Sequence, residues 1–195
     1  MTPTRLIIGI SGSSGIIYGI QLLKALQALP IETHLIVTKA AQVTRTYETA
    51  LTYTELKTLA DVAYHPEDIT APIASGSYPT LGMIIAPCSM NTLAEIAHSL
   101  SGNLLSRAAD VVLKERRRLA LVPRESPLHQ GHLQNMLTVT QMGGIICPPA
   151  PAFYQQPNSI LDLVNDNVGR ILDLFGIESG LTQPWDANLA FNTPR

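Results

Sequence analysis

Apolar residues gather in five short runs that alternate along the chain with amphipathic stretches. These runs predict strands at residues 6–10, 33–38, 83–86, 119–122 and 144–147. Each run is almost continuously apolar, with no alternation of polar and apolar positions. That pattern is typical of strands buried on both faces of a parallel sheet.

Between the runs, apolar residues recur at helical spacing. Strands that alternate with helices predict an α/β fold with a doubly wound, mainly parallel sheet. A helix is expected at residues 15–29, and further helices are expected around residues 104–115 and 164–175. The three stripes are Leu22, Leu23, Leu26 and Leu29; Leu104, Ala108 and Val111; and Val164, Val168, Ile171 and Phe175.

Two stretches interrupt this alternation. Residues 67–80 are rich in Ser, Pro and Gly, and residues 148–158 contain four prolines, so neither is expected to form a helix or a central strand. The length of 195 residues predicts one domain over residues 1–195, with a core at about 5–177 and a C-terminal tail at 178–195. Long loops at strand ends are where α/β proteins place ligand contacts.

Charge is sparse and balanced. Charged residues make up 14% of the chain and the net charge is −2. A typical domain carries roughly 25% charged residues, so we expect part of the surface to be buried in a homo-oligomer. The absence of a basic excess argues against nucleic acid as a partner, and no apolar run is long enough to span a membrane. Two widely separated cysteines, Cys88 and Cys147, fit a reducing, cytoplasmic setting.

The first predicted strand runs into the glycine–serine loop GISGSSG, residues 9–15. Its glycine spacing is neither the dinucleotide-binding fingerprint nor the P-loop. The second strand ends at Thr38 and Lys39, without the acidic residue that would hold an adenine ribose. We therefore expect a mononucleotide phosphate, bound by backbone N–H groups at the start of the helix at 15–29. The alternative is a tight turn with no ligand.

A similar arrangement follows the third predicted strand. That strand ends at Pro87-Cys88-Ser89, and a helix is expected to start near Asn91. Ser89 and Thr92 are typical capping residues that also present hydroxyl and N–H groups at the carboxyl edge of the sheet. Two strand ends with this chemistry predict a pocket between them. Cys88 is expected to pack as a small buried residue.

These motifs together resemble those of the UbiX-type flavin prenyltransferases, over residues 5 to 177. The resemblance rests on GISGSSG, TKAAQ, ETALT, ASGSYPTLGMIIAPCSMNTLAEIA, RAADVVLKERR with LVPRE, PPAPAFYQQP and NVGRILDLFGI. It implies a Rossmann-like fold, bound FMN and no metal. It also implies transfer of a dimethylallyl group from dimethylallyl phosphate to N5 and then C6 of reduced FMN. Each active site of the family lies where subunits of a dodecamer meet, and the prenylated FMN then serves a UbiD-type decarboxylase.

The resemblance also implies roles for individual residues. The expected flavin-binding residues are Gly12, Ser13, Ser14, Thr38, Cys88, Ser89, Met90, Asn91 and Arg124; Ser13 stands where the family usually has alanine, and Thr38 where it usually has serine. The expected catalytic residues are Ser14, Glu48, Lys114, Glu125 and Trp185. The residues expected around dimethylallyl phosphate are Arg107, Lys114, Tyr154 and Arg170.

Physical chemistry supports the cation set. The departing phosphate is an anion, so positive side chains should converge on it, and Glu48 could pass a proton to it or take one from the flavin. Each assignment also has a simpler alternative. Arg170 could pair with Asp166 on a helix surface, Lys114 could end a solvated helix beside Glu115, and Tyr154 could pack on the surface.

Two other functions remain open at this point. A cysteine decarboxylase on the same fold would need a histidine after the second strand, and KAAQVTRTYET contains none. A flavin-binding regulator without activity would have no use for the cations.

The pathway of the downstream decarboxylase, ubiquinone synthesis or phenolic acid breakdown, is not determined by the sequence. His129 and His132 lack a third ligand for a metal site.

Overall fold

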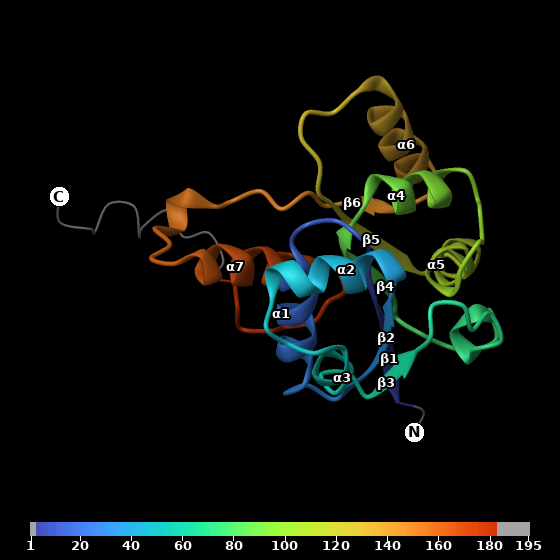
Figure 1. Ribbon diagram of the computed structural model, residues 1–195, viewed down its shortest axis with the longest axis horizontal. Coiled ribbons are helices and arrows are strands. Elements are labelled where there is room, and N and C mark those ends of the chain that lie inside the picture. Colours follow the sequence, from blue (N-terminus) through green and yellow to red (C-terminus); the bar gives the residue numbers. More distant parts are fainter. Residues whose placement is uncertain (1–2, 183–195) are drawn as a thin grey trace.

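The parallel sheet predicted from the buried runs is present in the computed structural model, which describes residues 3–182. Six strands follow the order β3-β2-β1-β4-β5-β6, and every neighbouring pair is parallel. Their bounds are β1 Thr4–Ile10, β2 Ile31–Val37, β3 Val62–Tyr64, β4 Gly82–Cys88, β5 Arg118–Pro123 and β6 Ile145–Ile146. The Rossmann-like α/β architecture expected from the sequence is thereby confirmed (Figure 1).

The central strands are buried on both faces, as their apolar runs predict. All seven residues of β4 and the last five of both β1 and β2 are buried. Winding proceeds outward in both directions from β1, which pairs with β2 on one side and β4 on the other. The carboxyl ends of β1 and β4 therefore flank the switch point of the sheet, the position at which open α/β folds bind ligands.

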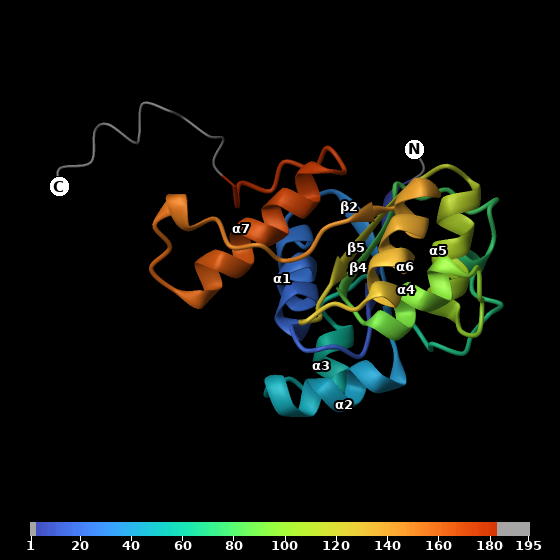
Figure 2. The ribbon, with the colours of Figure 1, turned by 90° about the horizontal axis from the view of Figure 1, so that it is seen from above.

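Helices cover both faces of the sheet, giving three layers (Figure 2). On one side α1 and α7 pack together over the sheet, and α4, α5 and α6 lie on the other. Helix α2 packs against α1 beyond the strand ends. The helices are α1 Ile16–Leu26, α2 Lys39–Glu48, α3 Tyr53–Lys57, α4 Met90–Ala97, α5 Leu104–Lys114, α6 Gln130–Gln141 and α7 Ile160–Asp173.

Some boundaries differ from the sequence prediction. The strand expected at residues 144–147 is reduced to Ile145–Ile146, and the helix expected at 15–29 ends at Leu26. The edge strand Val62–Tyr64 was not predicted, because three residues at a sheet edge are too few to show a pattern. The proline-rich stretch at 148–158 contains one 3₁₀ turn, Phe153–Gln155. No helix between residues 3 and 182 is long and apolar enough to cross a bilayer.

Candidate functional site

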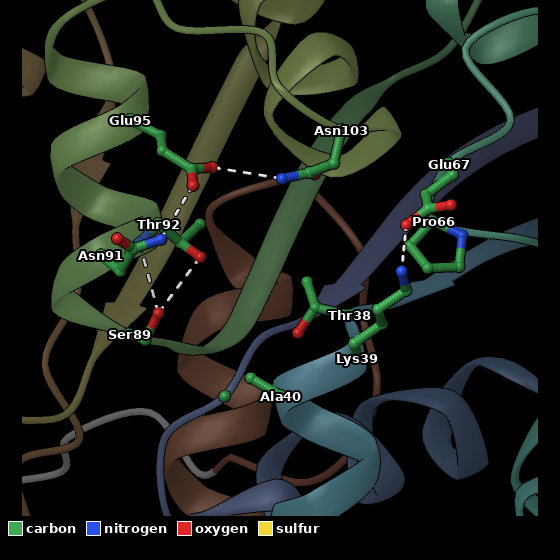
Figure 3. A pocket seen from close by; sticks show the side chains of 11 residues that line it. Thr38, Lys39, Ala40, Pro66, Glu67, Ser89, Asn91, Thr92, Glu95 and Asn103 are labelled. Atoms are coloured by element: carbon green, nitrogen blue, oxygen red, sulfur yellow. Dashed lines mark hydrogen bonds and ion pairs between the residues drawn. The ribbon is translucent and has the colours of Figure 1, made fainter.

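A cavity of about 360 Å³ opens at the switch point (Figure 3). The loops after β1, β2 and β4 supply most of its wall, as the two strand-end motifs predicted. Its lining includes Gly12, Thr38, Ala40, Ser89, Asn91 and Thr92. Of the residues expected to bind flavin, the cavity therefore brings together Gly12, Thr38, Ser89 and Asn91.

Two helices begin at this cavity. Thr38 caps α2, and its Oγ1 accepts a hydrogen bond from the Ala41 N–H at 3.2 Å. Ser89 caps α4: its Oγ accepts from the Thr92 N–H at 3.2 Å and donates to Thr92 Oγ1 at 3.2 Å. Helix N-termini carry partial positive charge and free N–H groups, so two of them around one cavity favour an anion such as a phosphate.

The wall of the cavity is tightly built where the β1–α1 loop meets α2. A Cβ atom added to Gly12 would lie 2.3 Å from the Ala40 Cβ, far inside van der Waals contact. Glycine therefore allows the loop and the first turn of α2 to approach each other. This close approach places the end of β2, with the Thr38 hydroxyl, beside the glycine–serine loop.

The start of α1 is occupied differently from the sequence prediction. Its free N–H groups were expected to bind a ligand phosphate, and in this structure two of them bond to a side chain instead. The carboxylate of Glu48, from the last turn of α2, accepts from the Gly15 N–H at 2.8 Å and from the Ile16 N–H at 3.0 Å. Gly15 has a φ of 104°, a conformation that glycine adopts without steric cost. The anion at this helix belongs to the chain itself.

Two residues expected to be functional, Ser14 and Arg124, interact with that carboxylate. Partial burial alone would raise the pKa of Glu48, but several favourable contacts outweigh it. The Ser14 hydroxyl, the two backbone N–H groups and the positive charge of Arg124 together hold the pKa of Glu48 below its usual value. The backbone N–H of Arg124 bonds to Cys88 O at 3.3 Å, which ties the β5 end to the β4 end. Glu48 is consequently ionised at neutral pH.

Two carboxylates that sequence reasoning missed also line the cavity. Glu95 accepts from Asn91 Nδ2 at 2.8 Å and from Asn103 Nδ2 at 3.3 Å, and Glu67 pairs with Lys39 (Figure 3). The spacing of Asn91 and Glu95, four residues apart on one helix, is a signal that could have identified the first pair. Asn103 and Glu67 come from distant loops, so no local pattern indicates them.

The cations expected around the prenyl phosphate do not converge within one chain. Arg107 pairs with Asp110 at 2.8 Å on α5, and Lys114 pairs with Glu115 where α5 ends. Because β5 starts at Arg118, Lys114 lies near the amino edge of the sheet, opposite the cavity. Helices α5 and α7 cover opposite faces (Figure 2).

Arg170, on α7, pairs with Asp173 at 3.1 Å. The alternative pairing of Arg170 with Asp166 is wrong, because Asp166 is buried and accepts from Gln155 Nε2 at 2.7 Å. The alternative for Lys114, an ion pair with Glu115 at the helix end, is what one chain shows. The side chain of Arg170 is 67% exposed, so it is accessible to a further partner.

The remaining predicted residues lie around these elements. Tyr154 lies in the 3₁₀ turn Phe153–Gln155 and is 61% exposed, and Met90 is the first residue of α4. The Glu125 carboxylate accepts from the Ser126 N–H at 2.9 Å. Cys88 is fully buried, and burial raises the pKa of its thiol, as expected of a packing residue. Trp185 lies outside the described residues.

The histidine pair His129 and His132 stacks with ring centroids 3.6 Å apart. His129 caps α6, its Nδ1 accepting from the Gly131 N–H at 3.0 Å. Among residues 3–182, no group of three or more His, Cys, Asp or Glu side chains is placed to hold a metal ion.

Comparison with known proteins gives a consistent result. A model of the family described as Flavoprotein matches residues 1–169. The flavin prenyltransferase UbiX of Escherichia coli K12 is 53% identical over 174 residues, covering 89% of this chain and 92% of the relative. The enzyme of the same name from Neisseria meningitidis is 52% identical over 181 residues, covering 93% of this chain and 96% of the relative.

Solved structures agree. The crystal structure of AnUbiX (PadA1) in complex with FMN and dimethylallyl pyrophosphate has a TM-score of 0.93 and 46% identity, covering 95% of this chain and 98% of that one. A dodecameric FMN-dependent UbiX-like decarboxylase from Escherichia coli O157:H7 has a TM-score of 0.92, covering 94% of this chain and 100% of that one. A PPC decarboxylase at 22% identity and a TM-score of 0.62 shares the fold alone.

Proposed function

The chain belongs to the flavoprotein family, among the UbiX-type flavin prenyltransferases, and from that premise we propose that it transfers a dimethylallyl group to reduced FMN. One observation carries the proposal beyond the likeness. An anion cavity and an ionised carboxylate lie at the same edge of the sheet, on opposite sides of the glycine–serine loop. The cavity can hold the flavin phosphate, and the Glu48 carboxylate can act on protons of the flavin ring.

The residues present fit FMN. Its phosphate would be held by Gly12, Thr38, Ser89 and Thr92, which offer hydroxyl and N–H donors at the starts of α2 and α4. A Cβ at Gly12 would fill the space between the loop and α2, so this cradle depends on glycine. When bound, reduced FMN supplies the nucleophilic ring positions that accept the prenyl group.

Glu48 and Ser14 provide the proton chemistry in this proposal. The pKa of Glu48 is lowered, so its carboxylate is charged at neutral pH and has room to receive a proton. Of its two expected roles, we propose that Glu48 takes a proton from the flavin. The Ser14 hydroxyl holds the carboxylate in place, and Arg124 balances its charge.

The prenyl phosphate requires cations from more than one copy of the chain. Within one chain Lys114 lies at the end of α5 remote from the cavity and Arg107 lies near the start of the same helix, whereas Arg170 lies on α7. We propose that a homo-oligomer, a dodecamer as in the UbiX-like protein from Escherichia coli, joins these groups around dimethylallyl phosphate. Each cation already has an acidic neighbour, which the substrate phosphate would displace or share.

The product leaves this chain for another enzyme. We propose a UbiD-type decarboxylase as the recipient of prenylated FMN, in ubiquinone synthesis or in phenolic acid breakdown. Both cysteines are free thiols, which supports a cytoplasmic location.

The decisive experiment is anaerobic incubation of the full chain with reduced FMN and dimethylallyl phosphate, followed by mass spectrometry of the extracted flavin. A flavin heavier by one prenyl unit is expected, and unchanged FMN would refute the proposal. A parallel reaction with dimethylallyl pyrophosphate tests which ester is used. Carbon dioxide release from a cysteine substrate would instead favour the decarboxylase alternative, and flavin binding without either reaction would indicate a regulator.

A further inference from the structure

The anion cavity contains a carboxylate that forms no ion pair with any cation of residues 3–182. Glu95, on α4, lines the cavity together with the hydroxyls at the starts of α2 and α4 (Figure 3). Lys39 is the one cation among the described lining residues, and it already pairs with the other carboxylate, Glu67. The cavity therefore offers an anion two helix N-termini, but it also places an uncompensated negative charge in the same wall.

The position of this charge is fixed by neutral groups. The two oxygens of Glu95 accept separate hydrogen bonds, at 2.8 Å from Asn91 Nδ2 and at 3.3 Å from Asn103 Nδ2. Asn103 also caps α5, so its own position is set by that helix. Amide donors hold a carboxylate in place without cancelling its charge, and the negative charge is consequently a built part of the cavity wall.

The charge of Glu95 reaches the end of β4. Burial raises the pKa of the Cys88 thiol, and the negative charge of Glu95 raises it further. Cys88 directly precedes Ser89, which caps the helix start that faces the cavity. A phosphate held at that helix start lies within range of the same charge, and like charges repel each other at such distances.

The flavin is a substrate in the proposed reaction. Prenylated FMN retains its phosphate and must leave after each turnover, unlike a resident cofactor. A phosphate site built on free lysine or arginine side chains would hold the product tightly. Helix ends and hydroxyls opposed by a carboxylate bind the phosphate less tightly, and such differences in affinity are expressed mostly in the rate of dissociation.

We propose that Glu95 limits the affinity of the cavity for the flavin phosphate and thereby promotes the release of prenylated FMN. This inference rests on the proposed function and assigns a role in product release to a residue of the cavity wall. The repulsion acts on the phosphate, so it does not change the affinity for the ring system. Riboflavin, which lacks the phosphate, separates the two contributions.

The test compares Glu95→Gln with the wild type in the assembled full chain, after removal of flavin. Glutamine has nearly the same shape as glutamate but no charge. Titration followed by flavin fluorescence should give a Kd for FMN about three- to twenty-fold lower in the variant, and the difference should shrink at high salt. Riboflavin should bind both proteins equally. Prenylated FMN should dissociate more slowly from the variant, while the single-turnover rate of prenyl transfer stays the same.

Glu178→Gln is the matched control, since it removes the same charge beside Thr4, where β1 begins at the opposite edge of the sheet. That variant should bind FMN as the wild type does. Equal or weaker FMN binding by Glu95→Gln would overturn the proposal, and so would an equal gain for riboflavin or for Glu178→Gln. A wild type that binds no FMN, or that binds it without prenyl transfer, would instead refute the proposed function.

Discussion

Substitution of Gly12 by alanine tests the close approach on which the anion cavity depends. The new Cβ would lie 2.3 Å from the Ala40 Cβ, and 3.1 and 3.2 Å from the Ala40 carbonyl carbon and Cα. The loop and α2 must separate to relieve this overlap. Overpacking of this kind costs about 1–3 kcal/mol, and we expect the lower half of that range because Ala40 lies at the surface.

The consequence is measurable in two assays. A loss of about 1–2 kcal/mol lowers the unfolding temperature of a domain of this size by roughly 2–8 °C. FMN affinity should fall as well, because α2 carries Thr38 and the helix start that face the phosphate. Thermal unfolding without flavin and FMN titration report the two effects separately.

A second substitution makes the reasoning refutable. Ala40→Gly removes the atom that the new methyl group meets, at a cost of its own of about 0.5–1 kcal/mol for glycine in a helix. The double variant Gly12→Ala/Ala40→Gly should therefore recover most of the affinity and lose less stability than the sum of the single variants. If the double variant instead lost as much stability as the two single variants together, Gly12 and Ala40 would not constrain each other.

Three further outcomes are expected. Glu48→Gln should retain FMN binding but lose turnover, and full activity of the variant would exclude Glu48 as the base. Because the pKa of Glu48 is lowered, the wild-type rate should fall with acid only below the pH range in which an ordinary glutamate titrates. Burial lowers the pKa of His34 in the folded protein, so the unfolded chain binds a proton more readily than the folded one. The free energy of unfolding should therefore decline as pH falls below about 6.5, and denaturant titrations of His34→Gln should show a smaller decline. Cys88, fully buried with a raised thiol pKa, should react with a thiol reagent only on unfolding, later than Cys147; rapid labelling of Cys88 in the native protein would contradict its burial.

The sequence predicts the core of this fold well because burial leaves a local pattern. The runs around Ile8, Ile36 and Ile85 are apolar since both faces of each strand are covered. Helix α2 was not predicted, because only Ala41 of its ten residues is buried and it therefore has no apolar stripe. Its existence matters, since it supplies Glu48.

The site was predictable in part. Gly12, Thr38 and Ser89 follow strand ends, and parallel topology brings strand ends together at one edge. The partner of the α1 N-terminus lies 33 residues away from Gly15, on a helix with no burial pattern, so the local motif indicated a ligand anion where the fold places a side chain. Glu95 and Asn103 meet only through the packing of α4 beside α5.

The carboxylate of Glu48 at the start of α1 has a consequence for how the enzyme begins its work. The start of this helix carries its own counter-charge, so it needs no ligand to neutralise it. The group expected to receive the proton is aimed in advance by two backbone N–H groups and one hydroxyl. Preorganisation of this kind lets binding energy be used on the incoming molecules rather than on assembling the machinery.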